Sequence, residues 1–288
     1  MIRLAVRAPA PAAEQVLAAL LELAPSGVEQ VDGDGFVEFA VYGPPGELPE
    51  LDIGEAEVGG VRVTVSGREV PGDWAERWKR FHVPVMIGEH RTGGALYVRP
   101  PWEPAAGRPG VIDLVIDPGR AFGTGAHATT RLCLELLLEL AEGEVRGSVC
   151  DLGCGSGVLS IAAARLGFGP ITALDSDLLA VEATAANARY NGVVLDRVEQ
   201  ADLRDGPAPQ AHLVLANLMR PLLLRVAELM ESPPPALIAS GLLEKEADKV
   251  AAAFAPLVER RRVSSTGWTA LLLQRQTADD ASAGAATT

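Results

Sequence analysis

From residue 148 onward, short apolar runs alternate with longer segments in which apolar residues recur at helical spacing. The short runs predict strands over 148–152, 170–174, 197–201, 211–216 and 236–240, and the longer segments predict helices over 157–166, 178–191, 221–230 and 244–254. Two strand-like runs, 257–264 and 268–274, follow with no helix between them, as in an antiparallel hairpin. The alternation predicts an α/β fold with a doubly wound, Rossmann-like sheet of seven strands.

The N-terminal residues show a different pattern, in which strand signals outnumber helix signals. The Asp32-Gly-Asp-Gly35 stretch marks a hairpin, and residues 44–57, rich in Pro and Glu, are interpreted as a connection. The predicted order is β-α-β-β followed by a further strand, over residues 2–8, 12–24, 27–31, 36–42 and 61–66. We therefore expect a small α+β domain of ferredoxin-like type over residues 1–70.

The middle of the chain connects these two patterns. Residues 71–82 predict a short linker helix, on which Trp74 and Trp78 share one face and either anchor the domain junction or line a substrate mouth. A hairpin is predicted over 82–99 and a strand over 110–116. The larger domain is then expected over 83–275, and the small, polar residues of 276–288 are expected to be a disordered tail.

Composition and charge narrow the class of protein. The 288-residue chain carries a net charge of −13, and residues 1–70 hold twelve Asp and Glu against four Arg and no Lys, a net of −8. Such a surface repels phosphate backbones and attracts basic partners, although solubility alone also explains it. No apolar run reaches the roughly 18 residues of a membrane helix. We expect a monomeric cytoplasmic protein with no membrane association and no direct nucleic-acid binding.

The cysteines predict neither a disulfide framework nor a metal site. There are three, Cys133, Cys150 and Cys154, and none forms a Cys-x-x-Cys pair. We expect buried, inert thiols and no bound metal.

A glycine loop at the end of the first strand of the larger domain carries the main chemical signal. Asp151-Leu-Gly-Cys-Gly-Ser-Gly157 leads from a strand into a helix, a geometry that brings backbone close to a nucleotide-like ligand. The spacing is not the Gly-x-Gly-x-x-Gly dinucleotide pattern, so a nicotinamide cofactor is disfavoured. The loop resembles that of S-adenosylmethionine-dependent methyltransferases, in which Gly153 and Gly155 would approach the cofactor.

Two acids follow at the ends of the next two strands. Asp175 lies about 20 residues beyond the loop, where a carboxylate accepts both ribose hydroxyls in nucleotide-binding units. Asp177, closer to the following helix, fits its N-cap better. Asp202 is interpreted either as a polar neighbour of the adenine ring or as a solvated loop acid.

Asn217 ends the strand predicted over 211–216, at the carboxyl edge of the sheet. In amino-group methyltransferases, an Asn or Asp there presents a carbonyl oxygen to the substrate N–H and aims the nitrogen lone pair at the methyl group. The alternative is a turn former or helix cap. The next residues, Leu-Met-Arg-Pro221, lack the aromatic ring that would stack a flipped nucleobase.

The stretch Asp117-Pro-Gly-Arg-Ala-Phe-Gly-Thr-Gly-Ala-His-Ala-Thr-Thr130 opens a helix just before the glycine-loop strand. Thr130 is a candidate partner for the carboxylate or amino end of the cofactor, and Phe122 a candidate cover for the methyl group. His127 is interpreted either as a residue near the chemistry or as a helix-start residue. Arg120 is interpreted either as a residue near the chemistry or as surface charge.

Together, this stretch, the glycine loop, Ala216-Asn217-Leu and Asp73-Trp74-x-x-x-Trp78-Lys79 resemble the bacterial ribosomal protein L11 methyltransferases, from about residue 2 to residue 274. The resemblance implies that Thr130, Gly153, Asp175 and Asn217 contact S-adenosylmethionine and that Asn217 also meets the target amine. It implies methyl transfer to lysine ε-amino and N-terminal α-amino groups of a basic ribosomal protein, held by the N-terminal domain. Positions Ala126 and Ala128 depart from the family and receive no role.

The target amine must be neutral before it attacks. A lysine with a pKa of about 10.4 loses its proton at a cost of roughly 4.6 kcal/mol at pH 7, and a desolvated site lowers that cost. No residue of the sequence is identified as a general base, so we expect solvent to take the proton. A methyltransferase of small amines and a non-catalytic S-adenosylmethionine-binding module remain the alternatives.

Overall fold

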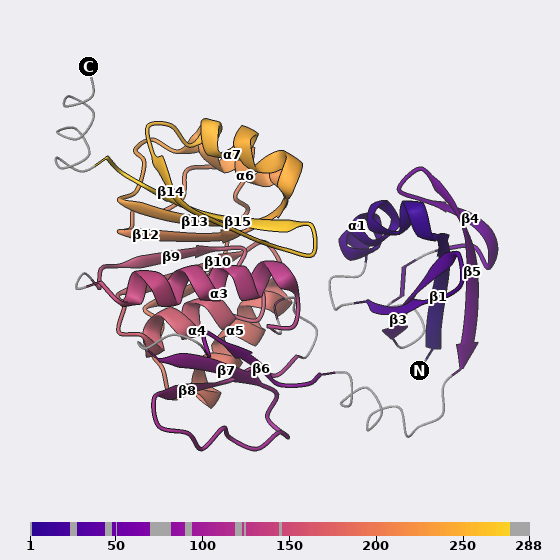
Figure 1. Cartoon of the computed structure of the whole chain (residues 1–288), viewed down its shortest axis with the longest axis horizontal. Helices are drawn as coiled ribbons and strands as arrows, with labels where there is room; N and C mark the ends of the chain where they lie inside the picture. Colours follow the sequence, from indigo (N-terminus) through magenta and orange to yellow (C-terminus); the bar gives the residue numbers. More distant parts are fainter. Residues whose placement is uncertain are drawn as a thin grey trace. The chain divides into compact units, whose positions relative to one another are not determined.

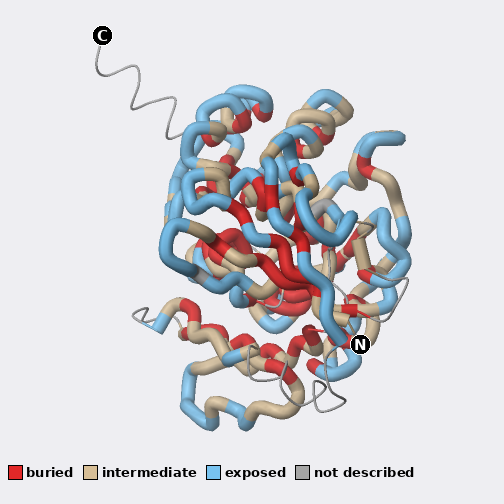
Figure 2. Tube along the Cα trace, turned by 90° about the vertical axis from the view of Figure 1, so that its right-hand side faces the viewer, coloured by how far each residue is buried: buried red, intermediate tan, exposed pale blue. Residues whose placement is uncertain are grey.

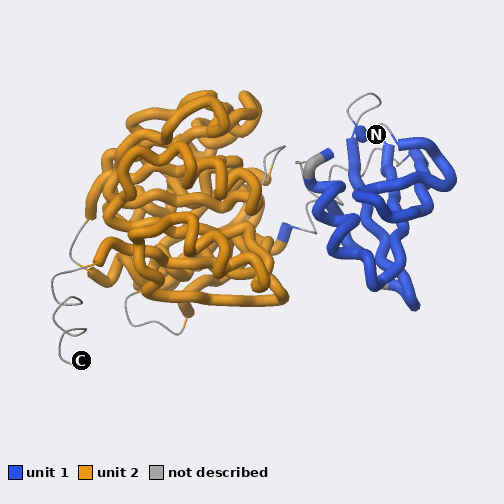
Figure 3. Tube along the Cα trace, turned by 90° about the horizontal axis from the view of Figure 1, so that it is seen from above, with its two compact units in different colours: residues 1–82, 119–122 blue, residues 83–118, 123–288 orange. Residues whose placement is uncertain are grey.

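The computed structural model describes residues 2–23, 28–43, 48–49, 51–69, 82–89, 94–118, 123, 125–143 and 146–276. Two compact units make up the chain, one of residues 1–82 and 119–122 and the other of residues 83–118 and 123–288 (Figure 3). The expected Trp74 and Trp78 helix face lies outside the described residues, as does the expected tail beyond residue 276. Each unit has its own apolar core.

Within the described residues, the first unit is a five-stranded antiparallel sheet with the α-helix α1 (Ala13–Leu23) packed against it (Figure 1). Its strands lie in the order β2-β3-β1-β5-β4 and are β1 (Ile2–Pro9), β2 (Glu29–Asp32), β3 (Phe36–Gly43), β4 (Gly54–Val58) and β5 (Val61–Glu69). Val16 and Leu20 of the helix join alternate residues of β1, among them Leu4 and Val6, in the core. The period-2 pattern of the strand and the helical spacing of α1 therefore each contribute an apolar face to this core.

Strand β4 corrects the expectation that residues 44–57 are only a connection. Glu55 and Glu57 are exposed, whereas Val58 is buried, and the strand pairs antiparallel with β5. The Glu-rich composition hid an alternation that an edge strand needs. Within the described residues α1 is the one α-helix of this unit, so β4 stands where the βαββαβ order of a ferredoxin-like domain has its second helix.

The second unit is built on a seven-stranded sheet with the order β11-β10-β9-β12-β13-β15-β14 (Figure 1). The strands are β9 (Val149–Leu152), β10 (Ile171–Asp175), β11 (Arg197–Gln200), β12 (Leu213–Asn217), β13 (Ala236–Leu243), β14 (Val258–Ser265) and β15 (Trp268–Gln274). Strands β9 to β13 pair in parallel, and β14 and β15 form the antiparallel hairpin that the sequence predicted. The predicted α/β sheet is therefore present.

Helices cover both faces of this sheet, and the central strands are buried between them (Figure 2). Helices α3 (Ala128–Ala141), α4 (Val158–Arg165) and α5 (Leu178–Tyr190) contribute to one apolar cluster, and α6 (Arg220–Leu229) and α7 (Ala247–Ala253) to the other. Neighbouring residues of one strand, Val149 and Cys150, belong to opposite clusters. Burial on both faces explains why all four residues of β9 are buried.

A separate three-stranded sheet, β6 (Val85–Ile87), β7 (Ala95–Arg99) and β8 (Val111–Val115), belongs to the same unit. Strands β6 and β7 are antiparallel, as the hairpin pattern predicted, but β8 pairs with β7 in parallel. Its Ile87, Leu96, Val98 and Leu114 belong to the α3 side of the main core. Strand β8 therefore ends two residues before Asp117, where the candidate segment of the site begins.

The three thiols are free and buried, as expected, and burial raises the pKa of Cys133 and of Cys150 to about 12. Among the described helices, none has the length and apolar character needed to cross a membrane.

Candidate functional site

The candidate residues meet at the carboxyl ends of three neighbouring strands. Leu152 at the end of β9 pairs with Leu174 of β10 on one side and with Ala216 of β12 on the other. Asp175 and Asn217, each one residue further on, therefore flank the glycine loop. The chain order of the strands reverses direction at β9, which is where open α/β sheets form their ligand crevice.

The glycine loop has a shape that other residues do not adopt easily. Gly153, Gly155 and Gly157 have φ of +72°, +54° and +80°. A Cβ on Gly153 would lie 2.5 Å from Leu218 Cδ2. The N–H groups of Gly153 and Cys154 donate to the Leu174 carbonyl at 2.8 and 2.9 Å, so the loop is fixed to the end of β10.

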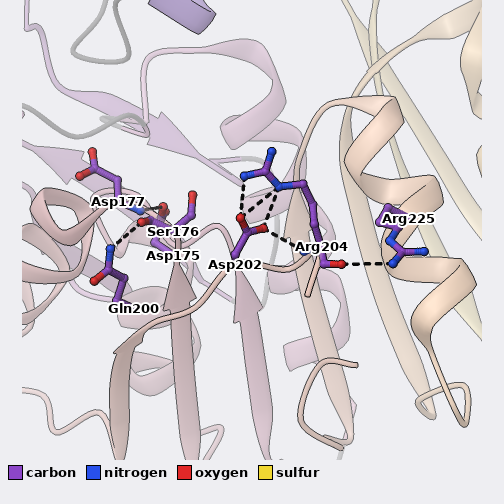
Figure 4. Close-up of polar contacts among 7 residues, drawn as sticks. All are labelled: Asp175, Ser176, Asp177, Gln200, Asp202, Arg204 and Arg225. Atoms are coloured by element: carbon purple, nitrogen blue, oxygen red, sulfur yellow. Dashed lines mark hydrogen bonds and ion pairs between the residues drawn. The ribbon is translucent and has the colours of Figure 1, made fainter. Parts of the chain in front are cut away.

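Asp175 is held by backbone donors on both of its oxygens. Oδ2 accepts from the Gly155 N–H at 2.9 Å, and Oδ1 accepts from the Asp177 N–H at 3.0 Å. Each carboxylate oxygen keeps a further lone pair, so this side chain can still accept from two hydroxyls. Asp177 caps α5 through its bond from the Leu179 N–H, as expected; its contact with Asp175 is drawn in Figure 4.

Asp151, the acid of the glycine motif, is buried at 1% exposure beneath the loop. Its Oδ2 accepts from the Ser160 hydroxyl at 2.6 Å and from the Ser160 N–H at 3.1 Å. Burial, together with the nearby charge of Asp175, raises the pKa of Asp151 to about 6 in spite of the Ser160 hydrogen bonds, which lower it. Within the described part of the chain no donor reaches Oδ1, and a buried acceptor of this kind suits a site that a ligand completes.

On the other flank, Asn217 contacts Thr130. The Asn217 Nδ2 donates to the Thr130 hydroxyl at 3.3 Å, and Thr130 is buried in the first turn of α3. The carbonyl oxygen Oδ1 of Asn217 is thereby left as the acceptor for another group. The N-cap of α6 is Met219, so the alternative role of Asn217 as a helix cap is wrong.

Close backbone packing holds the residue after Asn217. The Leu218 N–H donates to the Ser240 carbonyl at 3.0 Å, at a bulge in β13. At Gly241, with φ of +84°, a Cβ would lie 2.4 Å from the Leu218 carbonyl oxygen. The position of Asn217 therefore depends on a backbone contact with β13 that sequence motifs did not indicate.

His127 is the N-cap of α3, which supports its interpretation as a helix-start residue. Its Nδ1 lies 3.4 Å from the Thr129 N–H, and its ring meets Trp268 edge-on with centroids 5.1 Å apart. Burial lowers its pKa, and the charge of Arg131 adds to this. Phe122 and Arg120 lie outside the described residues.

Asp202 lies just past β11, where the preceding Ala201 N–H donates to the Asp175 carbonyl at 2.8 Å, and its side chain is bound by a neighbouring arginine. Arg204 donates to both of its oxygens, with Nε to Oδ1 at 2.9 Å and Nη2 to Oδ2 at 2.6 Å, and Arg225 binds the Arg204 carbonyl (Figure 4). The Arg204 guanidinium lowers the pKa of Asp202 to about 2. Asp202 is thus an ion-paired acid in an exposed loop, and its place beside the adenine ring stays a prediction.

Sequence reasoning missed a set of buried polar residues on α5. Thr184, Asn187 and Asn191 have exposures of 0%, 1% and 9%, and they bind backbone groups of the glycine loop and of β8. Their spacing of three and four positions on a helix otherwise rich in Ala is a signal that predicts a shared face.

The sequence of this chain is similar to those of known proteins. The sequence model of the family described as "Ribosomal protein L11 methyltransferase" matches residues 51–276. A protein of that name from Pelotomaculum thermopropionicum is 42% identical over 207 residues, 69% of this chain and 64% of the relative. One from Geotalea uraniireducens is 41% identical over 208 residues, 66% of this chain and 64% of the relative. The chain thus spans a little under two thirds of the length of these relatives.

A solved structure gives the same result at the level of the fold. It is described as a ribosomal protein L11 methylase from Lactobacillus delbrueckii subsp. bulgaricus, with a TM-score of 0.56 and 27% identity. The match covers 67% of this chain and 99% of that chain.

Proposed function

Because the chain belongs to the ribosomal protein L11 methyltransferase family, we propose that it transfers methyl groups from S-adenosylmethionine to lysine ε-amino and N-terminal α-amino groups of ribosomal protein L11. One observation carries the proposal. On the β10 side of β9, Asp175 presents two acceptor oxygens, and on the β12 side the amide of Asn217 is fixed by its bond to Thr130.

We assign cofactor binding to Thr130, Gly153, Gly155, Asp175 and Asn217. Asp175 has the free lone pairs to bind a ribose diol, and the positive φ of Gly153 and Gly155 allows a ligand to approach backbone closely. The buried, unsatisfied Oδ1 of Asp151 supports this fit, as does the burial of Thr130. When bound, S-adenosylmethionine supplies an electrophilic methyl group on a sulfonium centre.

The role that we propose for Asn217 is orientation of the amine. Since its Nδ2 donates to Thr130, its Oδ1 is the atom that accepts a substrate N–H and turns the nitrogen lone pair toward the methyl group. Methyl transfer is in-line, so alignment is the main demand on the protein. Asn217 is thus the catalytic residue of the proposal.

Proton removal needs no dedicated base in this scheme. A lysine amine has a pKa of about 10.4 in water, and desolvation of the cation lowers it. An apolar site together with the Asn217 acceptor selects the neutral amine, and solvent receives the proton. The three residues after Asn217 contain no aromatic ring for base stacking, which supports an amine substrate over a nucleobase.

The substrate partner that we propose is a basic ribosomal protein, bound by the acidic N-terminal residues 1–70. Residues 71–82 would serve as the linker helix, residues 83–275 as the methyltransferase domain and residues 276–288 as a disordered tail. We further propose that the protein acts as a cytoplasmic monomer, without a nucleic-acid partner.

Incubation with labelled S-adenosylmethionine and total ribosomal proteins, followed by mass spectrometry, tests the function. We expect label on lysine and α-amine positions of L11. Label confined to added small amines would favour a small-molecule methyltransferase. Cofactor binding without any S-adenosylhomocysteine product would indicate a non-catalytic binding module.

A further inference from the structure

Helix α5 turns a polar face into the core, where helices of this fold normally bury apolar residues. Thr184 and Asn187 of the helix and its C-cap residue Asn191 follow one another at spacings of three and four residues, and all three are buried. Buried polar side chains persist when their hydrogen bonds are made. The partners of these three residues therefore indicate what the face is for.

The two ends of the face hold different parts of the molecule. The Thr184 hydroxyl donates to the Gly155 carbonyl at 3.0 Å, within the glycine loop. At the other end, the Asn191 amide accepts from the Val115 N–H at 2.8 Å and donates to the Val115 carbonyl at 2.7 Å. Asn191 thus fixes β8 to the helix, and within the described residues it makes no hydrogen bond to the glycine loop.

Asn187, between them, binds both parts at once. Its Oδ1 accepts from the Asp117 N–H at 2.9 Å, and its Nδ2 donates to the Ser156 carbonyl at 2.9 Å. A backbone N–H can only donate and a carbonyl can only accept, so these partners fix the orientation of the amide. The Ser156 hydroxyl in turn donates to the Gly123 carbonyl at 2.7 Å. The glycine loop is therefore bonded to both Asp117 and Gly123 through Ser156 and Asn187.

We propose that Asn187 is a positioning residue of the cofactor site, which sets the glycine loop against Asp117 and, through Ser156, against Gly123. This inference rests on the proposed function and adds a residue that acts through Ser156 and Asp117. Asn187 does not itself touch cofactor or substrate in this proposal. An amide suits the position because one side chain supplies a donor and an acceptor to two separate backbone segments.

The chain offers a matched control in Asn191, the C-cap residue one turn further on, whose amide is also bonded to the backbone of the β8 region. Asn187→Ala and Asn191→Ala are compared in the full-length protein for melting temperature and for the Kd of S-adenosylhomocysteine by calorimetry. We expect similar losses of melting temperature, a Kd raised by about tenfold or more in Asn187→Ala, and a change of less than about threefold in Asn191→Ala. Equal changes in Kd in the two variants, or none in Asn187→Ala, would overturn the proposal.

Amide hydrogen exchange without cofactor provides a readout that is independent of the proposed function. Peptides covering 153–158 are expected to exchange faster in Asn187→Ala than in the wild type, and to remain unchanged in Asn191→Ala. Unchanged exchange in Asn187→Ala would contradict the inference even if binding fell. A wild-type protein that binds no S-adenosyl ligand would refute the proposed function, whereas exchange would still decide the role of Asn187.

The isosteric pair Asn187→Asp and Asn191→Asp covers the case in which the alanine variants do not fold. Each variant keeps an acceptor oxygen and loses the N–H donor. Asn187→Asp loses the bond to the Ser156 carbonyl, and Asn191→Asp loses the bond to the Val115 carbonyl. Faster exchange in 153–158 for Asn187→Asp alone supports the proposal. The same exchange in both aspartate variants counts against it.

Discussion

Strand β9 has β10 on one side, called here the β10 flank, and β12 on the other, the β12 flank. Asp175 on the first flank and Asn217 on the second are fixed by different kinds of contact. On the β10 flank, backbone N–H groups of Gly155 and Asp177 converge on the carboxylate of Asp175. On the β12 flank, Asn217 makes one side-chain bond to Thr130, and the next residue is packed against the backbone at Gly241. The first arrangement fixes a charge that keeps spare acceptors, and the second fixes the direction of one amide. We therefore expect variants of the first flank to change cofactor affinity and variants of the second to change turnover.

The largest expected effect is that of Asn217→Ala on turnover. Loss of the acceptor removes the alignment of the amine, and kcat should fall by about 10²- to 10³-fold, or about 3–4 kcal/mol, while the cofactor Kd changes far less. Steady-state kinetics and calorimetry on the same preparation measure both quantities. Asn217→Asp, which keeps an acceptor, should retain more activity than the alanine variant. Full turnover with unchanged cofactor affinity in Asn217→Ala would rule out this role.

Asp151 lies in β9, between the two flanks. Because it is buried, its titration makes the stability of the protein depend on pH. Its pKa is raised from 3.8 to about 6 in the folded protein, so its contribution to stability is fully present below about pH 4 and is lost as the pH rises through 6. Asp151→Asn removes this dependence. Between pH 4 and pH 7.5 the free energy of unfolding of the variant should gain about 2 kcal/mol relative to wild type in denaturant titrations. Parallel pH profiles for the two proteins would contradict the expectation.

Asp175→Ala tests the affinity side of the comparison. Removal of the carboxylate should raise the Kd of S-adenosylmethionine by about 30-fold, or about 2 kcal/mol, with little change in kcat at saturating cofactor. Asp202→Ala is the control, because that carboxylate is paired with Arg204, and its Kd should change by less than about threefold. An equal loss in both variants would support the interpretation of Asp202 as an adenine contact.

The smallest expected effect is at Thr130, on the turnover side. Thr130→Val keeps the shape of the side chain but removes the hydroxyl that binds Asn217 Nδ2, and kcat should fall by about fivefold, or about 1 kcal/mol. Thr130→Ser, which keeps the hydroxyl, should retain most of the activity in the same kinetic assay. If the serine variant were as slow as the valine variant, packing and not the hydrogen bond would explain the loss.

Some of this molecule follows from the sequence alone. Apolar periodicity predicted the strands of the large sheet and the helices that cover it. The ends of the predicted strands identified Asp175 and Asn217 as candidates. Both kinds of signal are local properties of the chain. The same reasoning failed at β4, where Glu55 and Glu57 concealed an edge strand. Edge strands need only one apolar face, so composition identifies them poorly.

Contacts between distant residues were decided by the tertiary structure. The bond between Asn187 and Ser156, the packing of Leu218 on Gly241, and the burial that raises the pKa of Asp151 all depend on segments far apart in the chain. The sequence of a helix or strand records which face is polar, but not which backbone group that face will meet. The partner is determined only when the sheet order brings β8, α5 and the glycine loop together, since hydrogen bonding and desolvation depend on distance in space and not along the chain.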